Sequence, residues 1–187
     1  GQHRLEACIL AGTSFLTTIV KGIPRSAQIT VDRGRKRSAG DDLHISGMKY
    51  GNVISATINL LFGIAAGDTG KTASASLITR FADDNPEIED ICVSANRIRL
   101  GIIPYAAAFA FIAKRRGKHR KAEQMLDVLA TGVPHYNGDP IHALRERIIK
   151  LNQQKGSKSR AEVLDLFTAA WIAFDKRETR ALIRAVP

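Results

Sequence analysis

The first four residues, Gly1, Gln2, His3 and Arg4, carry groups that can bind a phosphate. Apolar residues at helical spacing predict a helix over residues 2–11, so these four residues lie at its amino end. A glycine there lets backbone N–H groups approach an anion, and the helix dipole favours negative charge at that end. Arg4 adds a forked guanidinium, and Gln2 and His3 add hydrogen bonds. We therefore expect a phosphate site here; a helix with merely exposed polar residues is the alternative.

Two further segments, 31–43 and 114–121, are rich in basic side chains. The first precedes a predicted helix and contains Arg33, Arg35, Lys36 and Arg37. The second joins two predicted helices, has no acidic residue, and contains Lys114, Arg115, Arg116, Lys118, Arg120 and Lys121. Such clusters neutralise nucleic-acid phosphates without reading bases, which makes binding salt-dependent. The alternative is that both are solvated basic turns.

Residues 1–12, GQHRLEACILAG, resemble the G-E-R-R-x-x-A-x-x-x-x-G box of the ParB family, and more closely its D-G-Q-H-R variant in phage and mobile-element proteins. The matching positions are Gly1, Arg4, Ala7 and Gly12. Gln2 stands in place of the family's Glu, and His3 in place of its first Arg. The Asp that precedes this glycine in the family is not part of the chain.

Two later stretches extend the resemblance. Residues 31–43, VDRGRKRSAGDDL, are similar to the D-T-G-R-K-R-T-A-x-D-x-L segment of the same proteins, with Arg33 in place of Thr. The motif at 138–140, then 144–145, and then 169–171 resembles their G-D-P…L-R…A-W pattern. The resemblance implies a ParB/sulfiredoxin-like, DNA-associated protein of phage or plasmid origin. It further implies that Gly1, Gln2, His3 and Arg4 hold a nucleotide or backbone phosphate, and that family strands preceding Gly1 are missing.

The elements that position these residues change in character along the chain. After the first helix, β-branched and aromatic residues predict short strands over 15–20 and 28–31. Helical periodicity then predicts helices over 38–46, 50–64, 72–83, 85–100, 104–116, 118–130, 140–153 and 159–175. The expected class is α+β, mostly α. We expect residues 38–187 to form an all-helical domain, and the resemblance implies that residues 1–37 are a partial ParB/sulfiredoxin-like α/β segment.

Residues 38–56 are a candidate helix-turn-helix, with Gly47 as the turn glycine. The residues expected to be buried around that turn are Leu43, Val53 and Ala56. The second helix would begin near Lys49 and offer to a DNA groove the side chains of Lys49, Tyr50 and Asn52. The alternative is ordinary packing of two helices joined by a glycine.

Other motifs have plainer interpretations. Residues 65–72, AAGDTGKT, nearly spell a P-loop, but they lack its first glycine and follow a helix instead of a strand, which argues against an NTPase. The histidines have no metal-ligand spacing. The pairs Asp41–Asp42 and Asp83–Asp84 could hold Mg²⁺ for phosphodiester hydrolysis, but adjacent acids more often cap helices or face solvent, so we assign no metal ligand. Phe167, Trp171 and Phe174 recur at helical spacing and are expected in the core.

Composition restricts the classes of function. The net charge of +10 and the pI near 10.0 favour a polyanionic partner, chiefly nucleic acid or an anionic membrane surface; a charge that only keeps the protein in solution is the alternative. Cys8 and Cys92 argue against a disulfide framework, and no apolar run reaches the length of a spanning helix, so a cytoplasmic location is expected. The alternatives left open are a ParB-like nuclease or nucleotide hydrolase using a nucleoside triphosphate with Mg²⁺, and a helical protein-interaction module. A homodimer is also left open.

Overall fold

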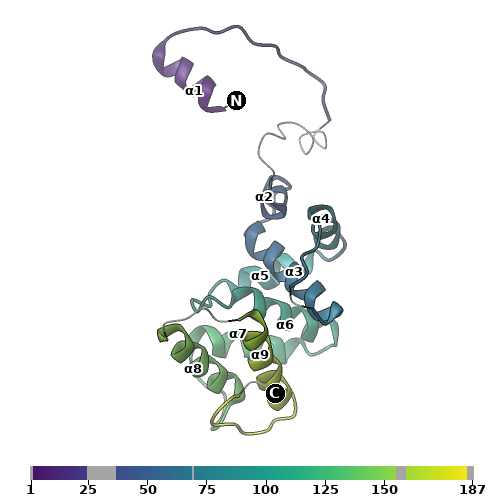
Figure 1. Cartoon of the computed structure of the whole chain (residues 1–187), viewed down its shortest axis with the longest axis vertical. Coiled ribbons are helices and arrows are strands. Elements are labelled where there is room, and N and C mark those ends of the chain that lie inside the picture. The colour runs from purple at the N-terminus through teal and green to yellow at the C-terminus, as the bar shows by residue number, and fades with distance from the viewer. Residues whose placement is uncertain (1, 25–36, 69, 155–158, 185–187) are drawn as a thin grey trace. The chain divides into compact units, whose positions relative to one another are not determined.

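The computed structural model describes residues 2–24, 37–68, 70–154 and 159–184. Within these ranges every regular element is a helix (Figure 1). The chain divides into two compact units, Gly1–Lys36 and Arg37–Pro187, and each is described by itself. None of the helices in those ranges is long and apolar enough to span a bilayer.

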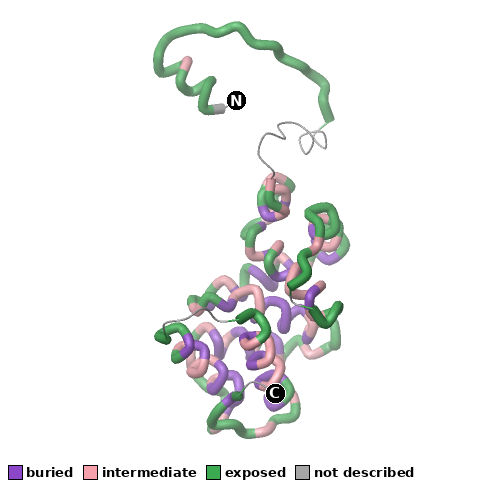
Figure 2. Tube along the Cα trace, viewed as in Figure 1, coloured by how far each residue is buried: buried purple, intermediate pink, exposed green. Residues whose placement is uncertain are grey.

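The amino-terminal unit contains one described helix, α1 (Gln2–Ala11), as the sequence predicts. Gly12 ends it with a φ of 62°, and the N–H groups of Gly12 and Thr13 bond back to carbonyls of the last turn. The strand predicted over 15–20 is wrong: residues 13–24 have no regular structure and are exposed (Figure 2). β-Branched residues form a strand only where a partner strand completes the hydrogen bonds, and the described part of this unit offers none. The other predicted strand, 28–31, lies outside the described residues.

Every regular element in the described part of the second unit is a helix, which confirms the expected helical body. All eight predicted helical segments are present, with ends shifted by a few residues. They are α2 (Ala39–Ile45), α3 (Gly51–Ala66), α4 (Ala75–Asp84), α5 (Glu87–Ala95), α6 (Ile103–Arg115), α7 (His119–Thr131), α8 (Pro140–Gln153) and α9 (Arg160–Asp175).

Side-chain caps begin several of these helices. Ser38 and Asp41 form a reciprocal capping box at α2, in which each side chain accepts the other residue's backbone N–H. Ser74 caps α4 and Ser159 caps α9 by accepting a backbone N–H three residues on. Because a cap depends only on neighbouring residues, local sequence decides where these helices start.

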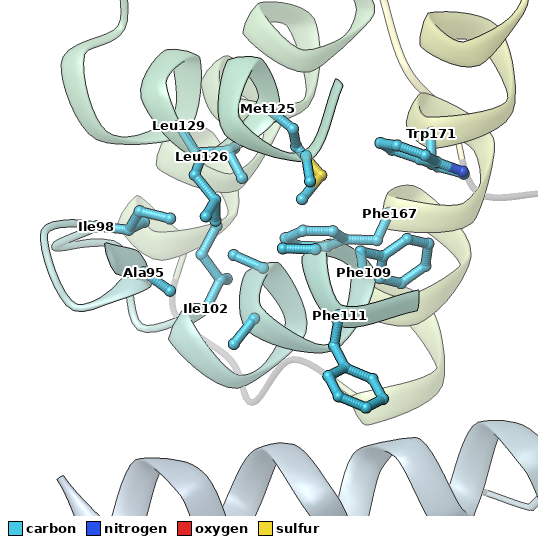
Figure 3. Close-up of a cluster of buried hydrophobic side chains, with 14 of the residues drawn as sticks. Ala95, Ile98, Ile102, Phe109, Phe111, Met125, Leu126, Leu129, Phe167 and Trp171 are labelled. Carbon is cyan, nitrogen blue, oxygen red and sulfur yellow. The ribbon is translucent and has the colours of Figure 1, made fainter. Parts of the chain in front are cut away.

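The core of the helical unit is built around α6, which packs against α3, α5, α7 and α9. Its run of alanines is completely buried, because small side chains let neighbouring helices approach closely. Larger side chains fill the space beyond: Figure 3 shows Met125 of α7 pointing toward the rings of Phe109 and Phe167. Phe167, Trp171 and Phe174 are 1%, 9% and 4% exposed, which confirms that they belong to the core.

The α2–α3 pair meets at two glycines. Gly40 and Gly51 are both buried, and a Cβ on Gly51 would collide with the backbone carbonyl oxygen of Gly40. Tyr50 precedes this contact with a left-handed backbone (φ 58°), a conformation that is uncommon outside glycine. The turn thus brings the helix axes together through backbone contact instead of side-chain interdigitation.

The prediction that three residues are buried around the Gly47 turn is confirmed in part. Leu43 is fully buried and Val53 is partly buried, but Ala56 is exposed. The predicted start of the second helix near Lys49 falls two residues before the observed start of α3. The reason is the left-handed Tyr50, which delays the helix.

Replacing Gly51 with alanine is predicted to lower the free energy of unfolding by about 1–3 kcal/mol, because the new methyl group must push backbone apart. Chemical denaturation measures this change. The control is Gly70→Ala, whose nearest obstacle is the flexible side chain of exposed Asp68 at 3.2 Å. Equal stability of the two variants would contradict the tight crossing of α2 and α3.

Candidate phosphate-binding site

The helix start that resembles the ParB box is placed only in part. Gly1 lies outside the described residues, and Gln2 begins α1. His3 and Arg4 follow in the first turn, and both are exposed. The side chains of this turn are therefore accessible to an anion, as phosphate binding requires.

The basic segment 31–43 is described from Arg37 onward, so Arg33, Arg35 and Lys36 lie outside the described residues. Arg37 is described and half-buried directly before the Ser38 cap of α2. Lys49 keeps an exposed side chain, while its backbone N–H donates to Glu89 Oε1 at 2.7 Å. That bond ties the α2–α3 turn to α5.

The basic side chains of segment 114–121 make two separate sets of structural contacts. Lys114 lies 3.9 Å from Glu123, and Arg115 lies 3.5 Å from Glu87 and over the ring of Phe111. Both cations also occupy the last turn of α6, where the helix dipole favours positive charge. The side chains of Lys114 and Arg115 therefore have local structural partners.

Lys118 and Lys121 form a second, stronger structural contact. Both ammonium groups bind the Asp175 carboxylate, and Lys121 Nζ also donates to the Asp175 backbone oxygen at 2.6 Å. Hydrogen bonds from Lys118 and Lys121 hold the pKa of Asp175 below its ordinary value. This cluster joins the start of α7 to the end of α9, which are more than 50 residues apart in sequence.

Arg120 lies beside this cluster and lines a pocket of about 580 Å³. The lining residues are Arg120, Lys121, Gln124, His135, Tyr136, Phe174, Arg177 and Thr179. They come from the first turns of α7, the α7–α8 loop, the end of α9 and the segment that follows α9. The lining holds three permanent cations and one histidine but no carboxylate, so we take it as the candidate phosphate-binding site.

Asp139 shapes the loop side of this pocket. Its side chain is 2% exposed and accepts the N–H groups of Ile141, at 2.9 Å, and of His135, at 3.1 Å. The first bond caps α8, and the second fixes the loop that carries His135 and Tyr136. Gly138 adds a tie to the chain after α9, since its carbonyl accepts the N–H of Arg180 at 2.7 Å.

Tyr136 has an unsatisfied hydroxyl in this setting. Its Oη atom is buried and has no hydrogen-bond partner within the described chain. Burial raises the pKa of Tyr136, as does the nearby Asp139 charge, whereas Arg177 opposes the rise. The phenol therefore stays protonated and retains an unused donor, with the charges of Asp139 and Arg177 near it.

The motifs that match the carboxy-terminal part of the resemblance have structural roles. Asp139 is the cap just described, and Trp171 is in the core. Arg145 Nε donates to the Leu129 carbonyl at 3.2 Å, which places a cation at the end of α7. These residues support the pocket from outside.

Sequence reasoning identified Arg120 and Lys121 but missed His135, Tyr136 and Arg177. Those three lie in two loops with no motif of their own. The only local signal is the basic pair Lys176–Arg177 directly after α9. Packing of α7 against α8 and of α8 against α9 brings the three segments together.

Metal and thiol chemistry receive no support from the geometry. Across the described ranges, no three His, Cys, Asp or Glu side chains lie close enough to hold a metal ion. Cys92 is fully buried against Thr57, and burial raises the pKa of its thiol to about 11. A thiol with that pKa is a poor nucleophile.

Comparison with protein-family models, with curated proteins and with solved structures finds no match to this chain.

Replacing Asp175 with asparagine is predicted to destabilise the protein by about 1 kcal/mol at neutral pH, a modest value because the ion pairs are partly exposed and screened. The pKa of Asp175 is lowered in the folded state, so its contribution is complete above the ordinary value of 3.8. The contribution disappears as pH falls through the lowered pKa. The difference between wild type and variant should therefore shrink in acid.

Urea denaturation at neutral and acidic pH measures this difference. The control is Asp165→Asn on the same helix, a half-buried residue for which no ion pair is seen in the described chain. A pH-independent difference for Asp175→Asn would show that the lysine cluster is not electrostatic in origin.

Proposed function

We propose that this is a DNA-associated protein that binds nucleic-acid phosphates without reading bases. The observation that carries the proposal is the pocket where Arg120, Lys121 and Arg177 converge without a lining carboxylate. The exposed start of α1, with its ParB-like residues, is proposed as a second phosphate contact.

Two of the three permanent cations that line the pocket lack an acidic partner among the described residues. Lys121 is tied to Asp175, but no acidic side chain of the described chain pairs with Arg120 or Arg177. Like charges around one pocket repel each other, and the excess charge of +10 adds to that repulsion. A bound phosphate removes the repulsion and accepts bidentate hydrogen bonds from a guanidinium.

The uncharged lining residues favour a nucleotide unit over a bare anion. Tyr136 offers its unused hydroxyl, and Gln124 and Thr179 add polar groups. Phe174, which is 4% exposed, closes the wall of the pocket beside them. Cationic and polar groups together bind nucleic-acid phosphates without reading bases.

The candidate helix-turn-helix contributes less to this proposal. Helix α3 has no basic residue, and it packs against α2, α4, α5 and α6. Among the proposed groove contacts, Lys49, Tyr50 and Asn52 are exposed, but they do not include a second cation. We therefore place the main phosphate contact at the pocket.

The double variant Arg120→Ala/Arg177→Ala is predicted to weaken binding of a duplex DNA and to reduce the salt slope of log K by about 2, because two phosphate contacts are lost. Fluorescence anisotropy over a salt series measures both quantities. The charge-matched control is Arg97→Ala/Arg99→Ala, two exposed arginines outside the pocket. Equal loss in the two double variants would show a general charge effect and overturn the assignment of the pocket.

A second experiment tests the ParB-like contact. Arg4→Ala, and separately Arg35→Ala/Lys36→Ala, are predicted to weaken DNA binding and flatten its salt dependence, because each removes cations from phosphate. Lys21→Ala, an exposed cation outside both motifs, is the control. Unchanged affinity at about 50 mM salt would remove these residues from the interface. Turnover of DNA or a nucleoside triphosphate in the same samples would favour the enzyme alternative.

A further inference from the structure

A second cavity, of about 300 Å³, lies elsewhere in the helical unit. It shares no residue with the pocket around Arg120 and Arg177 that is proposed to bind DNA, which is called the DNA pocket below. Helix α3, the segment before α4, and the first turns of α6 and α9 form its walls. Its lining residues are Asn52, Ser55, Ala56, Asn59, Leu60, Lys71, Thr72, Pro104, Tyr105 and Arg160. No acidic side chain is among them.

Two cations and two helix ends give this cavity a positive field. Lys71 and Arg160, which are far apart in the sequence, both line the cavity. Arg160 is also the first residue of α9, and Pro104 and Tyr105 belong to the first turn of α6. The partial positive charge of a helix dipole lies at that end, so both dipoles add to the field of the two side chains.

Hydrogen bonds and stacking hold the polar groups in place. Asn59 Oδ1 accepts the Ala73 N–H at 2.8 Å, which anchors the segment carrying Lys71 and Thr72 and leaves the Asn59 amide group as a donor. The Tyr105 ring stacks on Phe167, with centroids 5.8 Å apart and planes 25° apart. The Arg160 charge opposes the rise that burial causes in the pKa of Tyr105, so the guanidinium lies within electrostatic reach of the phenol.

The remaining lining residues define what else a ligand must carry. Ser55 and Thr72 add hydroxyl donors, while Ala56, Leu60 and Pro104 form an apolar part of the wall. A phosphate group has two negative charges and accepts many hydrogen bonds. It therefore matches the cationic and hydroxyl donors of this cavity better than a single carboxylate does. The apolar wall fits a small organic group attached to that anion.

We propose that this cavity is a binding site for a small phosphate monoester, with the phosphate between Lys71 and Arg160 and the organic group against Leu60 and Pro104. The P-loop-like sequence ends in Lys71 and Thr72, yet a helix precedes it, so the proposed binding uses these two side chains without a phosphate-wrapping loop. The cavity shares no lining residue with the pocket proposed for DNA binding, so the two sites are separate.

Isothermal titration calorimetry of the full chain with AMP, inorganic phosphate, adenosine and acetate tests this proposal. AMP is expected to bind saturably and more tightly than inorganic phosphate, whereas adenosine and acetate should bind at least about tenfold more weakly, since each lacks one half of the recognised chemistry. Inorganic phosphate binding as tightly as AMP would overturn the proposed role of the apolar wall. Adenosine binding as tightly as AMP would overturn the role of the cations.

Two variants locate the site. Lys71→Ala/Arg160→Ala is expected to weaken AMP binding about tenfold or more by removing the charges. Ala56→Phe is expected to have a similar effect by filling the cavity while leaving both charges present. The side chains at all three positions, 56, 71 and 160, are exposed. The midpoint of thermal unfolding should therefore change little in either variant.

The matched control is Arg120→Ala/Arg177→Ala, which removes two cations from the DNA pocket and should leave AMP affinity unchanged. Loss of DNA binding with intact AMP binding in this control would show that the two sites are independent. Absence of saturable AMP binding up to about 10 mM, or its loss in the control variant alone, would overturn the proposal.

Discussion

The burial of α6 is the constraint on which the rest of the helical unit depends. Its alanine side chains are too small to fill a core alone, so α3, α5, α7 and α9 must approach closely to exclude water. That approach determines where the ends of the surrounding helices lie. Both cavities are formed by such ends: one uses the starts of α6 and α9, and the other uses the start of α7 and the end of α9.

Three acidic side chains of the helical unit have structural partners. Asp139 caps a helix, Asp175 binds two lysines, and Glu89 ties a turn to α5. Each of these carboxylates is occupied by a structural partner. The cations that line the two pockets therefore face no carboxylate in the lining, although the sequence places acids within a few residues of several of them.

The same basic segment has both a structural and a proposed functional role. Lys118 and Lys121 hold α7 to α9, and this contact positions Arg120 beside Arg177. The fold thus divides the contiguous basic residues of segment 114–121 into two kinds. Some side chains have partners within the protein, and others line a pocket. Spacing alone does not separate the two kinds, because the division depends on where Asp175 lies.

The sequence by itself determined the helical elements of the body, because apolar periodicity and caps such as Ser38 and Ser159 act between neighbouring residues. It also determined the aromatic core of α9 and the excess positive charge. It wrongly predicted a strand over 15–20, because a strand needs a partner that local propensity does not supply. Only the tertiary structure brought His135, Tyr136 and Arg177 to Arg120, because that meeting depends on the packing of three helices whose relative positions no short segment encodes.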